Sequence, residues 1–523
     1  MPYVTQETAC QIHYDLCVIG AGAAGLAVAD SARQNGLSVL IVERGGEIAS
    51  VPRREPLLPV GSPHDPAHKT TREGLGGTLS IWGGRCVPFD PEDFSDRPGL
   101  GASWPISYED YAAWVPAASA LFEVEPRYNV ATPADWPTLE GIRMDTVELL
   151  SRHWFPAELR DRLTGPNGPD ILLDTEVTGM SWSDRRVRAI SVTGSAGAVS
   201  ISAADVVLAC GGLQSTQLLL EEERRKPGRL RGASWLGRGY MGHLTGSISE
   251  ITFRDAQTAA AFTYNARPDS APGRRRFLML PPDGPHIALW IESIAPGDPR
   301  HGSAEISAKT LLRGAPSGTW AAHLANVLRR PTEPLSGLRA AMRRARHPDQ
   351  RFPDRLIARR PGPYRLAYHA EHLPSPTSIA ALCPRPGPDG TRPLRIDFDY
   401  GADTIQGTVE AHRKLARALE DSGFARLELD PDDDVLAQRV RAAARDGYHQ
   451  IGLTRMSCSA DKGVVDEGCR VFGTDNLYVA SASVFPTSSQ ANPTLTIVAL
   501  ALRLADRLVA NQQRGTSAGS AVA

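Results

Sequence analysis

The chain has 523 residues, of which 41% are hydrophobic, and its formal net charge is −2. A chain of this length and composition can bury a large core, and it is expected to divide into two or more domains. A net charge so close to zero gives no electrostatic reason to expect a nucleic acid or an anionic membrane as partner.

The seven cysteines occur singly, without the spacing of disulfide frameworks or zinc sites, so we expect neither disulfides nor a metal site. No apolar run reaches the length that spans a bilayer. The first residues, MPYVTQETACQIHYD, lack the basic start and apolar core of a secretory signal. These features predict a cytoplasmic protein with no membrane partner.

The N-terminal region begins with an apolar strand at 16–19, followed by the glycine-rich turn 20–25, an alanine-rich helix and a second apolar strand at 39–42. Glu43 follows the second strand. A lone GxGxxG motif is weak evidence, but here strand, turn, helix, strand and acidic residue come in the order of a dinucleotide-binding unit. The sequence therefore predicts a Rossmann-type fold.

Each residue of this motif has a physical role in binding a dinucleotide. Gly20 permits the tight turn, Gly22 lets the backbone approach a pyrophosphate, and Gly25 allows the helix to pack closely on the strand. Glu43 can accept hydrogen bonds from ribose hydroxyls, which favours a cofactor without a 2′-phosphate, such as FAD or NAD.

The segments that follow mix helices and strands. A second glycine-rich stretch occupies 74–94, and by itself it is equally consistent with a surface loop. Helices are expected at 108–122 and 144–163. Strands and turns follow over 171–194, and a buried strand near 204–210 leads into two glycines and an amphipathic helix.

The pattern changes from about residue 236 to 399, where strand-like runs enclose an arginine-rich helical insertion at 303–360. We expect the arginine run to be a solvent-facing helix surface rather than a site for an anionic ligand. His243 and His369 lie in this block, and the sequence indicates ordinary polar roles for both.

Two helices, expected at 403–423 and 434–445, precede His449. A short strand at 476–480 and a polar turn then lead to Asn492 and a proline, an N-cap residue followed by proline at the first helical position. The helix that begins there is apolar on nearly all sides, so we expect its positive N-terminal end to lie inside the protein. Such an end suits a bound group that carries or develops negative charge.

The HxxG pattern of His449 to Gly452, with the strand, turn and Asn-Pro helix start that follow, resembles the glucose-methanol-choline (GMC) family of flavin alcohol oxidoreductases. In that family, the histidine of HxxG and a histidine or asparagine just before the last helix face the flavin ring. The resemblance implies that His449 is the catalytic base and that Asn492 holds the substrate oxygen. Taken alone, His449 is as consistent with a structural histidine, and Asn492 with a simple N-cap.

The resemblance also implies FAD as the cofactor. The stretch 74–94 matches the family segment that runs along the FAD pyrophosphate and under the flavin ring. Ile81 stands where covalent members carry a flavin-linked histidine, so we expect non-covalent FAD. The implied cofactor-binding residues are Gly20, Gly22, Ala23, Ala24, Gly25, Glu43, Arg44, Gly76, Gly77, Thr78, Trp82, Gly83, Val177, Cys210, Gly211, Ser483, Pro493 and Thr494.

The implied fold class is α/β with an α+β cap, in which an antiparallel-sheet substrate domain is inserted into a Rossmann-type FAD-binding domain. The expected boundaries are 1–235 for the first part of the FAD-binding domain, 236–400 for the substrate-binding cap, 401–448 for a helical segment that completes the cap, and 449–512 for the last part of the FAD-binding domain. The tail 513–523 is expected to be disordered.

Residues 464–496 resemble the bacterial GMC branch that acts on sugars and glycosides, which includes oxidases of aminoglycoside hydroxyls in antibiotic biosynthesis. The resemblance implies oxidation of a small-molecule alcohol by hydride transfer to flavin N5, with dioxygen or another acceptor reoxidising the flavin. Glu371 is a candidate carboxylate for a cationic substrate. The alternatives are a dehydrogenase with a non-oxygen acceptor, a non-redox lyase of the hydroxynitrile-lyase type, and a flavin-binding scaffold.

Overall fold

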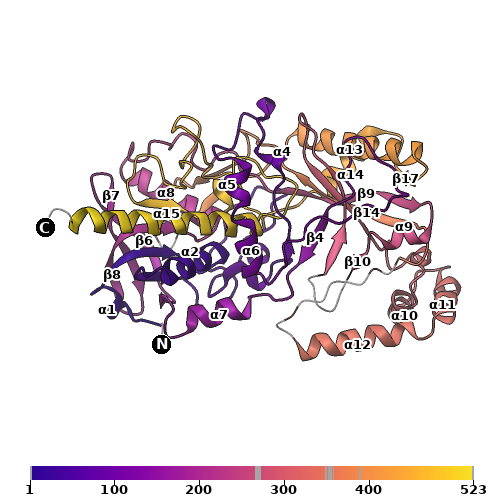
Figure 1. Cartoon of the computed structure of the whole chain (residues 1–523), viewed down its shortest axis with the longest axis horizontal. Helices are drawn as coiled ribbons and strands as arrows, with labels where there is room; N and C mark the ends of the chain where they lie inside the picture. The colour runs from indigo at the N-terminus through magenta and orange to yellow at the C-terminus, as the bar shows by residue number, and fades with distance from the viewer. Residues whose placement is uncertain are drawn as a thin grey trace.

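The computed structural model describes residues 3–265, 272–347, 350, 356, 358–387 and 390–520. In Figure 1 the chain forms two parts side by side. One part contains strand β8 with the long helix α15 and both chain ends, and the other contains strands β9 and β14 beside helix α13.

A seven-stranded sheet forms the core of the first part. Strand β1 (His13–Ile19) lies between β2 (Val39–Val42) and β8 (Gly197–Leu208), and both neighbours run parallel to it. β18 (Leu477–Val479) pairs in parallel with the end of β8, which returns the C-terminal segment to this sheet. The other strands are β5 (Asp170–Leu172), β6 (Glu176–Ser183) and β7 (Arg186–Gly194).

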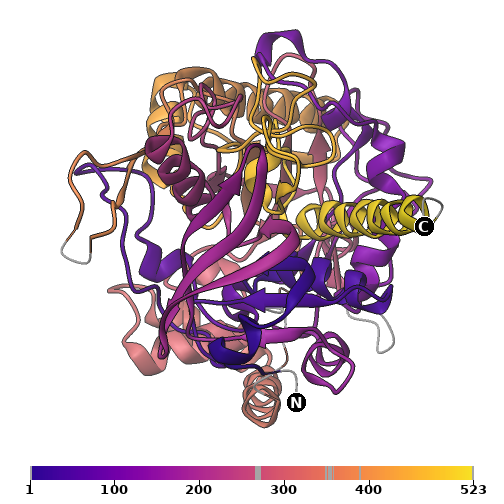
Figure 2. The ribbon, with the colours of Figure 1, turned by 90° about the vertical axis from the view of Figure 1, so that its left-hand side faces the viewer.

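Helices cover this mixed sheet, so its parallel strands β1 and β2 are apolar and mostly buried. All residues of β2 and the last four of β1 are buried. Helix α2 (Ala23–Gln34) packs against β1, β2 and α15 (Thr494–Ser520), and α15 also packs against α6 (Val115–Leu121). Figure 2 shows α15 alongside the twisted strands.

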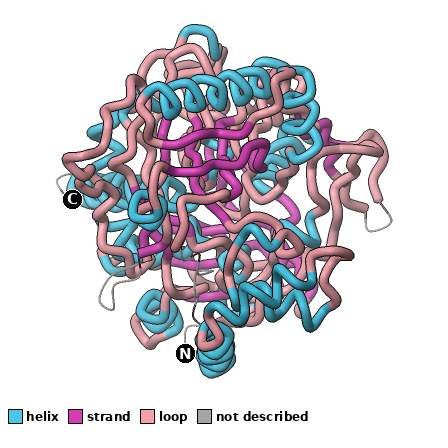
Figure 3. The backbone as a smooth tube through the Cα atoms, turned by 90° about the vertical axis from the view of Figure 1, so that its right-hand side faces the viewer, coloured by secondary structure: helices cyan, strands magenta, loops and turns pink. Residues whose placement is uncertain are grey.

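A five-stranded antiparallel sheet, in the order β12-β13-β14-β9-β17, forms the core of the second part. Its two central strands are β9 (His243–Phe253) and β14 (Tyr364–Glu371), and their pairing contains one irregularity in register. Helices run across the strands of this part in Figure 3. The other elements of this layer are β12 (Phe277–Met279), β13 (Ile287–Glu292), α13 (Ala402–Asp421), β17 (Ala425–Glu428) and α14 (Asp433–Ala443).

The expected fold class is confirmed, because a Rossmann-type sheet and an antiparallel-sheet domain are both present. The helices expected at 403–423 and 434–445 are also present, and the single helix expected at 108–122 occurs as two short helices, α5 (Tyr108–Ala112) and α6. Further elements are α1 (Gln6–Ala9), α3 (Ala67–Thr70), η1 (Gly77–Ser80), α4 (Pro91–Phe94), η2 (Pro98–Leu100), α8 (Gly212–Arg225), α9 (Ala256–Ala260), β10 (Tyr264–Asn265), η3 (Pro299–His301), β15 (Ile379–Leu382), β16 (Leu394–Asp397) and η4 (Ala482–Val484).

The prediction of a helix over 144–163 is wrong in its first half, where strand β4 (Val147–Leu150) forms instead. β4 pairs on one side with β3 (Arg85–Cys86) and on the other with β11 (Gly273–Arg275), and all of its residues are buried. Pairing on both edges outweighs the local helix preference of its leucines and glutamate. Helix α7 (Ala157–Thr164) supplies the second half.

The prediction of disorder from residue 513 is also wrong as far as Ser520, because α15 continues to that residue. Residues 510–514 contain no proline, and the Arg514 side chain donates to the Ala510 carbonyl at 3.2 Å. The helical hydrogen bonding is therefore not interrupted where the apolar face ends. Residues 521–523 lie outside the described residues.

The arginine-rich insertion contains α10 (Ala304–Arg313), α11 (Trp320–Arg329) and α12 (Glu333–Arg346). Helix α10 packs against the other two, and the group lies at the edge of the second part in Figure 1. Arg339 and Arg343 of α12 are exposed, as the prediction of a solvent-facing helix requires. The portions of the insertion at 348–349, 351–355 and 357 lie outside the described residues.

Asp205 on β8 predicts how stability depends on pH. Its carboxyl is buried, and burial raises its pKa to about 6 although Gln512 donates to Oδ2 at 3.0 Å. The unfolded chain titrates near about 3.9, so the folded state binds the proton more tightly and loses stability as pH rises from about 4 to about 6. Above that window the ionised, buried carboxylate costs about 3 kcal/mol.

We therefore expect Asp205→Asn to unfold at a higher temperature than the wild type at about pH 8, and at the same temperature at about pH 4. Thermal unfolding followed by circular dichroism at both pH values checks this. Asp506→Asn, at an exposed carboxylate of α15, is the control and should be neutral at both. An unchanged or lower midpoint for Asp205→Asn at about pH 8 contradicts the assignment.

Candidate active site

A cavity of about 690 Å³ connects the N-terminus of α2 with the N-terminus of α15, and His449 and Asn492 both line it. The sequence predicted catalytic and cofactor residues far apart in the chain, and the fold brings most of them to this cavity. The predicted cofactor residues that line it are Gly20, Gly22, Ala23, Ala24, Glu43, Arg44, Gly77, Thr78, Trp82, Gly83, Val177, Cys210, Gly211, Pro493 and Thr494.

Three predicted cofactor residues lie behind the cavity wall instead. A Cβ atom on Gly25 would lie 2.0 Å from the Gly20 carbonyl oxygen, so this glycine lets α2 begin close against the preceding turn. Gly76 adopts the left-handed conformation, with φ of 85°, just before η1. The Ser483 hydroxyl lies 2.6 Å from the Ser481 hydroxyl. All three therefore shape the backbone around the cavity.

The N-terminus of α2 opens onto the cavity. Gly22 is its N-cap residue, no side chain caps the helix there, and a Cβ atom on Gly22 would meet nothing within 4 Å. The free N–H groups and positive end of the helix dipole suit a phosphate. A Cβ atom on Gly77 would lie 3.3 Å from the Gly22 Cα, so the two glycine-rich segments form adjacent walls.

Glu43 holds these two segments together. Its Oε2 accepts from the Ala21 N–H at 2.8 Å, and its Oε1 accepts from the N–H groups of Gly45 and Gly74 at 2.8 and 2.9 Å. Burial raises the pKa of this carboxyl, while the N–H donors and Arg44 act in the opposite direction. The sequence pattern did not indicate this backbone-fixing role, and the expected ribose contact of Glu43 stays a prediction.

His449 is positioned by a turn that follows α14. Asp446 Oδ1 accepts from the backbone N–H groups of residues 447–449 at 2.6, 2.8 and 3.2 Å, so its carboxylate closes the turn. Gly452 has φ of 87°, and a Cβ atom there would lie 2.2 Å from the Gly239 carbonyl oxygen. This close approach explains why the motif requires glycine at that position.

Gln450 supports the same segment from its other side. Its Oε1 accepts from the Leu213 N–H in the first turn of α8 at 2.9 Å. A Cβ atom on Gly212 would lie 2.4 Å from the Gln450 carbonyl oxygen, so the helix start and the HxxG segment are in close contact. Gln450 is thus a structural neighbour of the catalytic position.

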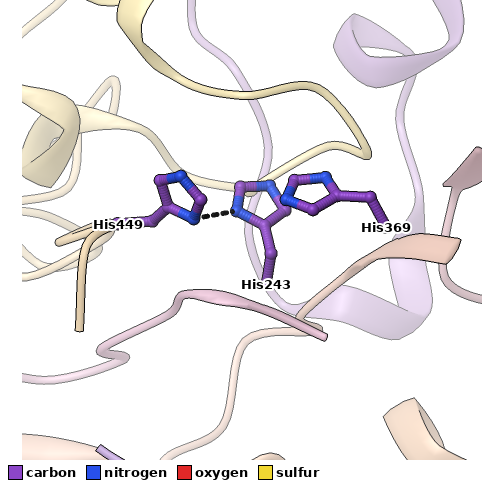
Figure 4. A group of neighbouring side chains, drawn as sticks. All are labelled: His243, His369 and His449. Atoms are coloured by element: carbon purple, nitrogen blue, oxygen red, sulfur yellow. Dashed lines mark hydrogen bonds between the residues drawn. The ribbon is translucent and has the colours of Figure 1, made fainter. Parts of the chain in front are cut away.

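Three histidines meet beside the cavity, as Figure 4 shows. His449 Nδ1 lies 3.0 Å from His243 Nδ1, and the rings of His243 and His369 stack with centroids 4.2 Å apart and an interplanar angle of 22°. The sequence indicated ordinary polar roles for His243 and His369. Their proximity to His449 follows from the pairing of β9 with β14, a register that no local pattern predicts.

Backbone carbonyls fix the protons on two of these rings. His243 Nε2 lies 3.2 Å from the Ser488 carbonyl oxygen and 3.1 Å from that of Ser489, so Nε2 carries the proton. His369 Nδ1 lies 2.6 Å from the Gln490 carbonyl oxygen and is likewise the donor. Burial and the neighbouring histidines hold the pKa of His243 well below its usual range and lower that of His369 to about 3, so both rings are neutral.

A carboxylate fixes the proton on His449. Asp446 Oδ2 lies 2.9 Å from His449 Nδ1 and also accepts from the His243 N–H at 2.7 Å. Burial opposes ionisation of Asp446, but His449, His243 and the Gly447 N–H outweigh it and lower the pKa of this carboxyl. Since an ionised carboxylate can only accept, His449 Nδ1 is the donor, and in the neutral ring the lone pair is therefore on Nε2.

The amide nitrogen of Asn492 lies 3.5 Å from His449 Nε2. The sequence allowed Asn492 to be a simple N-cap, but its side chain points toward the histidine. Helix α15 then begins as expected, because the Ile497 N–H donates to the Pro493 carbonyl at 2.8 Å. His449 and Asn492 therefore present a lone pair and an amide donor to the same end of the cavity.

The three histidines are close enough to hold a metal ion, since one nitrogen of each lies within 4.8 Å of the others. The geometry does not favour coordination. The lone pairs of His243 and His369 lie in nearly parallel, stacked ring planes and cannot converge on one ion. His243 Nδ1 also faces the His449 N–H at 3.0 Å, so the cluster is described by hydrogen bonds without a metal.

Glu371 does not face the cavity, so the expectation that it meets a cationic substrate is wrong. Its side chain is fully buried, and its two oxygens lie 3.0 and 2.9 Å from Arg97 Nη1. The His286 N–H also donates to it at 3.1 Å. A buried carboxylate of this kind needs its partners inside the fold, and that requirement cannot be read from sequence.

Comparison with known proteins agrees with this geometry. A family model described as GMC oxidoreductase matches residues 385–501, and a model of an NAD(P)-binding Rossmann-like domain matches residues 18–63. The C-terminal part of the chain therefore matches the C-terminal domain of GMC oxidoreductases. Paromamine 6′-oxidase of Streptomyces fradiae is 24% identical to this chain over 94% of the chain and 90% of the relative.

Two further proteins illustrate the range of similarity. A 6‴-hydroxyparomomycin C oxidase of Streptomyces lividus is 33% identical over 18% of this chain and 20% of its own length. The solved structure of an FAD-dependent oxidoreductase from Chaetomium thermophilum has the same fold, with a TM-score of 0.52 and 17% identity over 96% of this chain and 100% of that chain.

The chain is an FAD-dependent alcohol oxidoreductase, and its cavity fits the cofactor. The open N-terminus of α2 suits the pyrophosphate, and the α15 N-terminus suits negative charge on the flavin ring. Ile81 also lines the cavity and has no nucleophilic atom for a covalent link. Among the described residues, no helix combines the length and apolarity needed to cross a membrane.

The role of Glu43 can be tested by changing it to glutamine. In Glu43→Gln one acceptor becomes an amide donor, which leaves an N–H of the glycine-rich segments without its partner. Losing a hydrogen bond to a charged acceptor costs about 1.5–3 kcal/mol, so we expect FAD to bind ~10- to 100-fold more weakly. Fluorescence titration of the apoprotein with FAD measures this. Glu47→Gln, at an exposed neighbouring carboxylate, is the matched control, and equal affinities for both variants contradict the assignment.

Proposed function

We propose that this protein oxidises an alcohol group of a sugar, glycoside or aminoglycoside to the carbonyl compound, with His449 as the base. The observation that carries the proposal is the pairing of His449 Nε2 with the Asn492 amide at the end of a cavity that fits FAD. The similarity to paromamine 6′-oxidase over 94% of the chain supports the substrate class.

The hydrogen bonds of His449 favour the tautomer that a base needs. Nδ1 donates to Asp446 Oδ2 at 2.9 Å, so in the neutral ring the lone pair is on Nε2. When an alcohol is oxidised, the O–H proton passes to Nε2, the C–O single bond becomes a double bond, and the C–H hydrogen leaves as a hydride. Bound FAD supplies the two-electron acceptor for that hydride.

Asn492 holds the reacting oxygen. Its amide N–H and the His449 lone pair lie on the same side of the cavity, 3.5 Å apart, so a hydroxyl can accept from the amide while it donates to the ring. The hydroxyl is thereby fixed in position and orientation, which lowers the entropic part of the barrier. After proton transfer, the amide still stabilises the negative charge that develops on oxygen.

The charged residues that line the cavity affect which substrates can bind there. Within the described chain, its lining carboxylates all have partners, since Glu73 bonds to Arg44, Glu176 to Arg54, Glu221 to Arg224, Glu222 to Arg225, and Glu43 to backbone N–H groups. A neutral polyol therefore meets a cavity with paired charges. An aminoglycoside would bind with its ammonium groups toward solvent, outside this lining.

A substrate panel tests the proposal. The holoenzyme is mixed without oxygen with simple alcohols, neutral sugars, glycosides and aminoglycosides, and bleaching of the flavin absorption is followed. We expect bleaching by at least one sugar, glycoside or aminoglycoside, and a carbonyl product by mass spectrometry. Bleaching by simple alcohols alone would reject the carbohydrate assignment.

Admission of air then identifies the electron acceptor. Rapid recovery of the flavin colour with formation of peroxide indicates an oxidase, and slow recovery indicates a dehydrogenase that uses another acceptor. Absence of bleaching by every alcohol, together with cleavage of a cyanohydrin, would replace the redox proposal by a lyase.

Replacing the base gives the sharpest single test. We expect His449→Ala to keep FAD bound but to slow flavin reduction by ~10²-fold or more, because general-base catalysis typically contributes ~10²- to 10⁴-fold. Stopped-flow absorbance with the best substrate of the panel measures the rate. His13→Ala, at an exposed histidine on β1, is the control. Reduction at the wild-type rate in His449→Ala would exclude His449 as the base.

A further inference from the structure

Asp446 makes no contact in the proposed reaction, yet it is the most heavily hydrogen-bonded side chain beside the base. Oδ1 accepts from the N–H groups of residues 447–449, and Oδ2 accepts from the His243 N–H at 2.7 Å and from His449 Nδ1 at 2.9 Å. The residue is only 3% exposed. Because donors contact both of its oxygens, this buried carboxylate has a fixed position and orientation beside His449.

We propose that Asp446 is the positioning residue that keeps the proton of neutral His449 on Nδ1, so that Nε2 faces the substrate as the base. This inference rests on the proposed function of His449. It assigns to Asp446 no contact with substrate or cofactor, since its effect passes through the histidine ring.

His243 reinforces the same arrangement. Its Nε2 proton is committed to the carbonyl oxygens of Ser488 and Ser489, so its Nδ1 presents a lone pair to His449 Nδ1 at 3.0 Å. The His449 N–H is thus shared between the carboxylate and this lone pair. Both acceptors require the proton on Nδ1, and neither offers a donor to Nδ1 in the opposite tautomer.

The substitution Asp446→Asn separates this role from a general structural one. Asparagine keeps the shape of the side chain, and its carbonyl oxygen can still accept from the backbone N–H groups of the turn. Its NH₂ group then takes the place of Oδ2 and donates to His449 Nδ1. The ring must move its own proton to Nε2, where it blocks acceptance of the substrate proton.

We expect Asp446→Asn to bind FAD as the wild type does but to reduce it ~10²-fold or more slowly, close to the loss in His449→Asn. The double variant Asp446→Asn/His449→Asn should be no slower than His449→Asn, because Asp446 acts through the histidine. Asp205→Asn, a buried carboxylate outside the cavity, is the matched control and should keep the wild-type rate.

An NMR measurement that requires no turnover tests which nitrogen of His449 carries the proton. In protein with ¹⁵N-labelled histidine, the His449 signals are those that disappear in His449→Asn. In the wild type at neutral pH we expect a protonated Nδ1 and an unprotonated Nε2, and in Asp446→Asn the reverse. The wild-type spectrum keeps the proposal falsifiable even if Asp446→Asn does not fold, since a proton on Nε2 would overturn it.

The outcomes separate this inference from the proposed function. A wild-type reduction rate in Asp446→Asn, with His449→Asn inactive, would overturn the positioning role and leave the base assignment intact. A further rate loss in the double variant would assign Asp446 a separate structural role and would also overturn the proposal. Wild-type rates in both single variants would reject the proposed function itself.

Discussion

The active site depends on one buried negative charge. Asp446 is ionised inside the protein, where an unpaired carboxylate is strongly unfavourable, and N–H groups on both of its oxygens compensate the lost water. These donors come from the turn after α14 and from His243 at the start of β9. The same carboxylate therefore fixes the catalytic turn and attaches it to the antiparallel sheet.

This arrangement brings the two parts of the molecule together at His449 and Asn492. His449 is held by the turn and by His243, whereas Asn492 is held by the start of α15, which packs in the Rossmann part. The first residues of the Rossmann part contribute the open α2 N-terminus, and Glu43 ties that turn to the second glycine-rich segment. The residues that support the proposed catalytic pair, His449 and Asn492, therefore come from both parts.

Much of this could be predicted from sequence because it depends on local pattern. The order of strand, glycine turn, helix and acidic residue predicted the Rossmann unit, and the Asn-Pro pair predicted the start of α15. The network around His449 could not be predicted, because His243 and His369 reach it through the β9–β14 register. The strand β4 was missed for the same reason, since its two partners lie far away in the chain. Of the residues in that network, only Asp446 lies close to His449 in the sequence, three residues before it, and the sequence pattern did not indicate its role.

The charge state of His243 and His369 affects how readily His449 can take up a proton. When His449 takes a proton, it becomes a cation whose Nδ1 lies 2.9 Å from the Asp446 carboxylate, so the buried negative charge gains a partner. A positive charge on His243 or His369 would oppose that step, because both rings lie within 6 Å of His449 by centroid, at 4.7 and 5.7 Å. Burial keeps the pKa of His369 at about 3 and that of His243 well below its usual range, which prevents this competition. The burial that lowers the pKa of these two histidines makes them poor bases, which agrees with the proposal that His449 receives the proton.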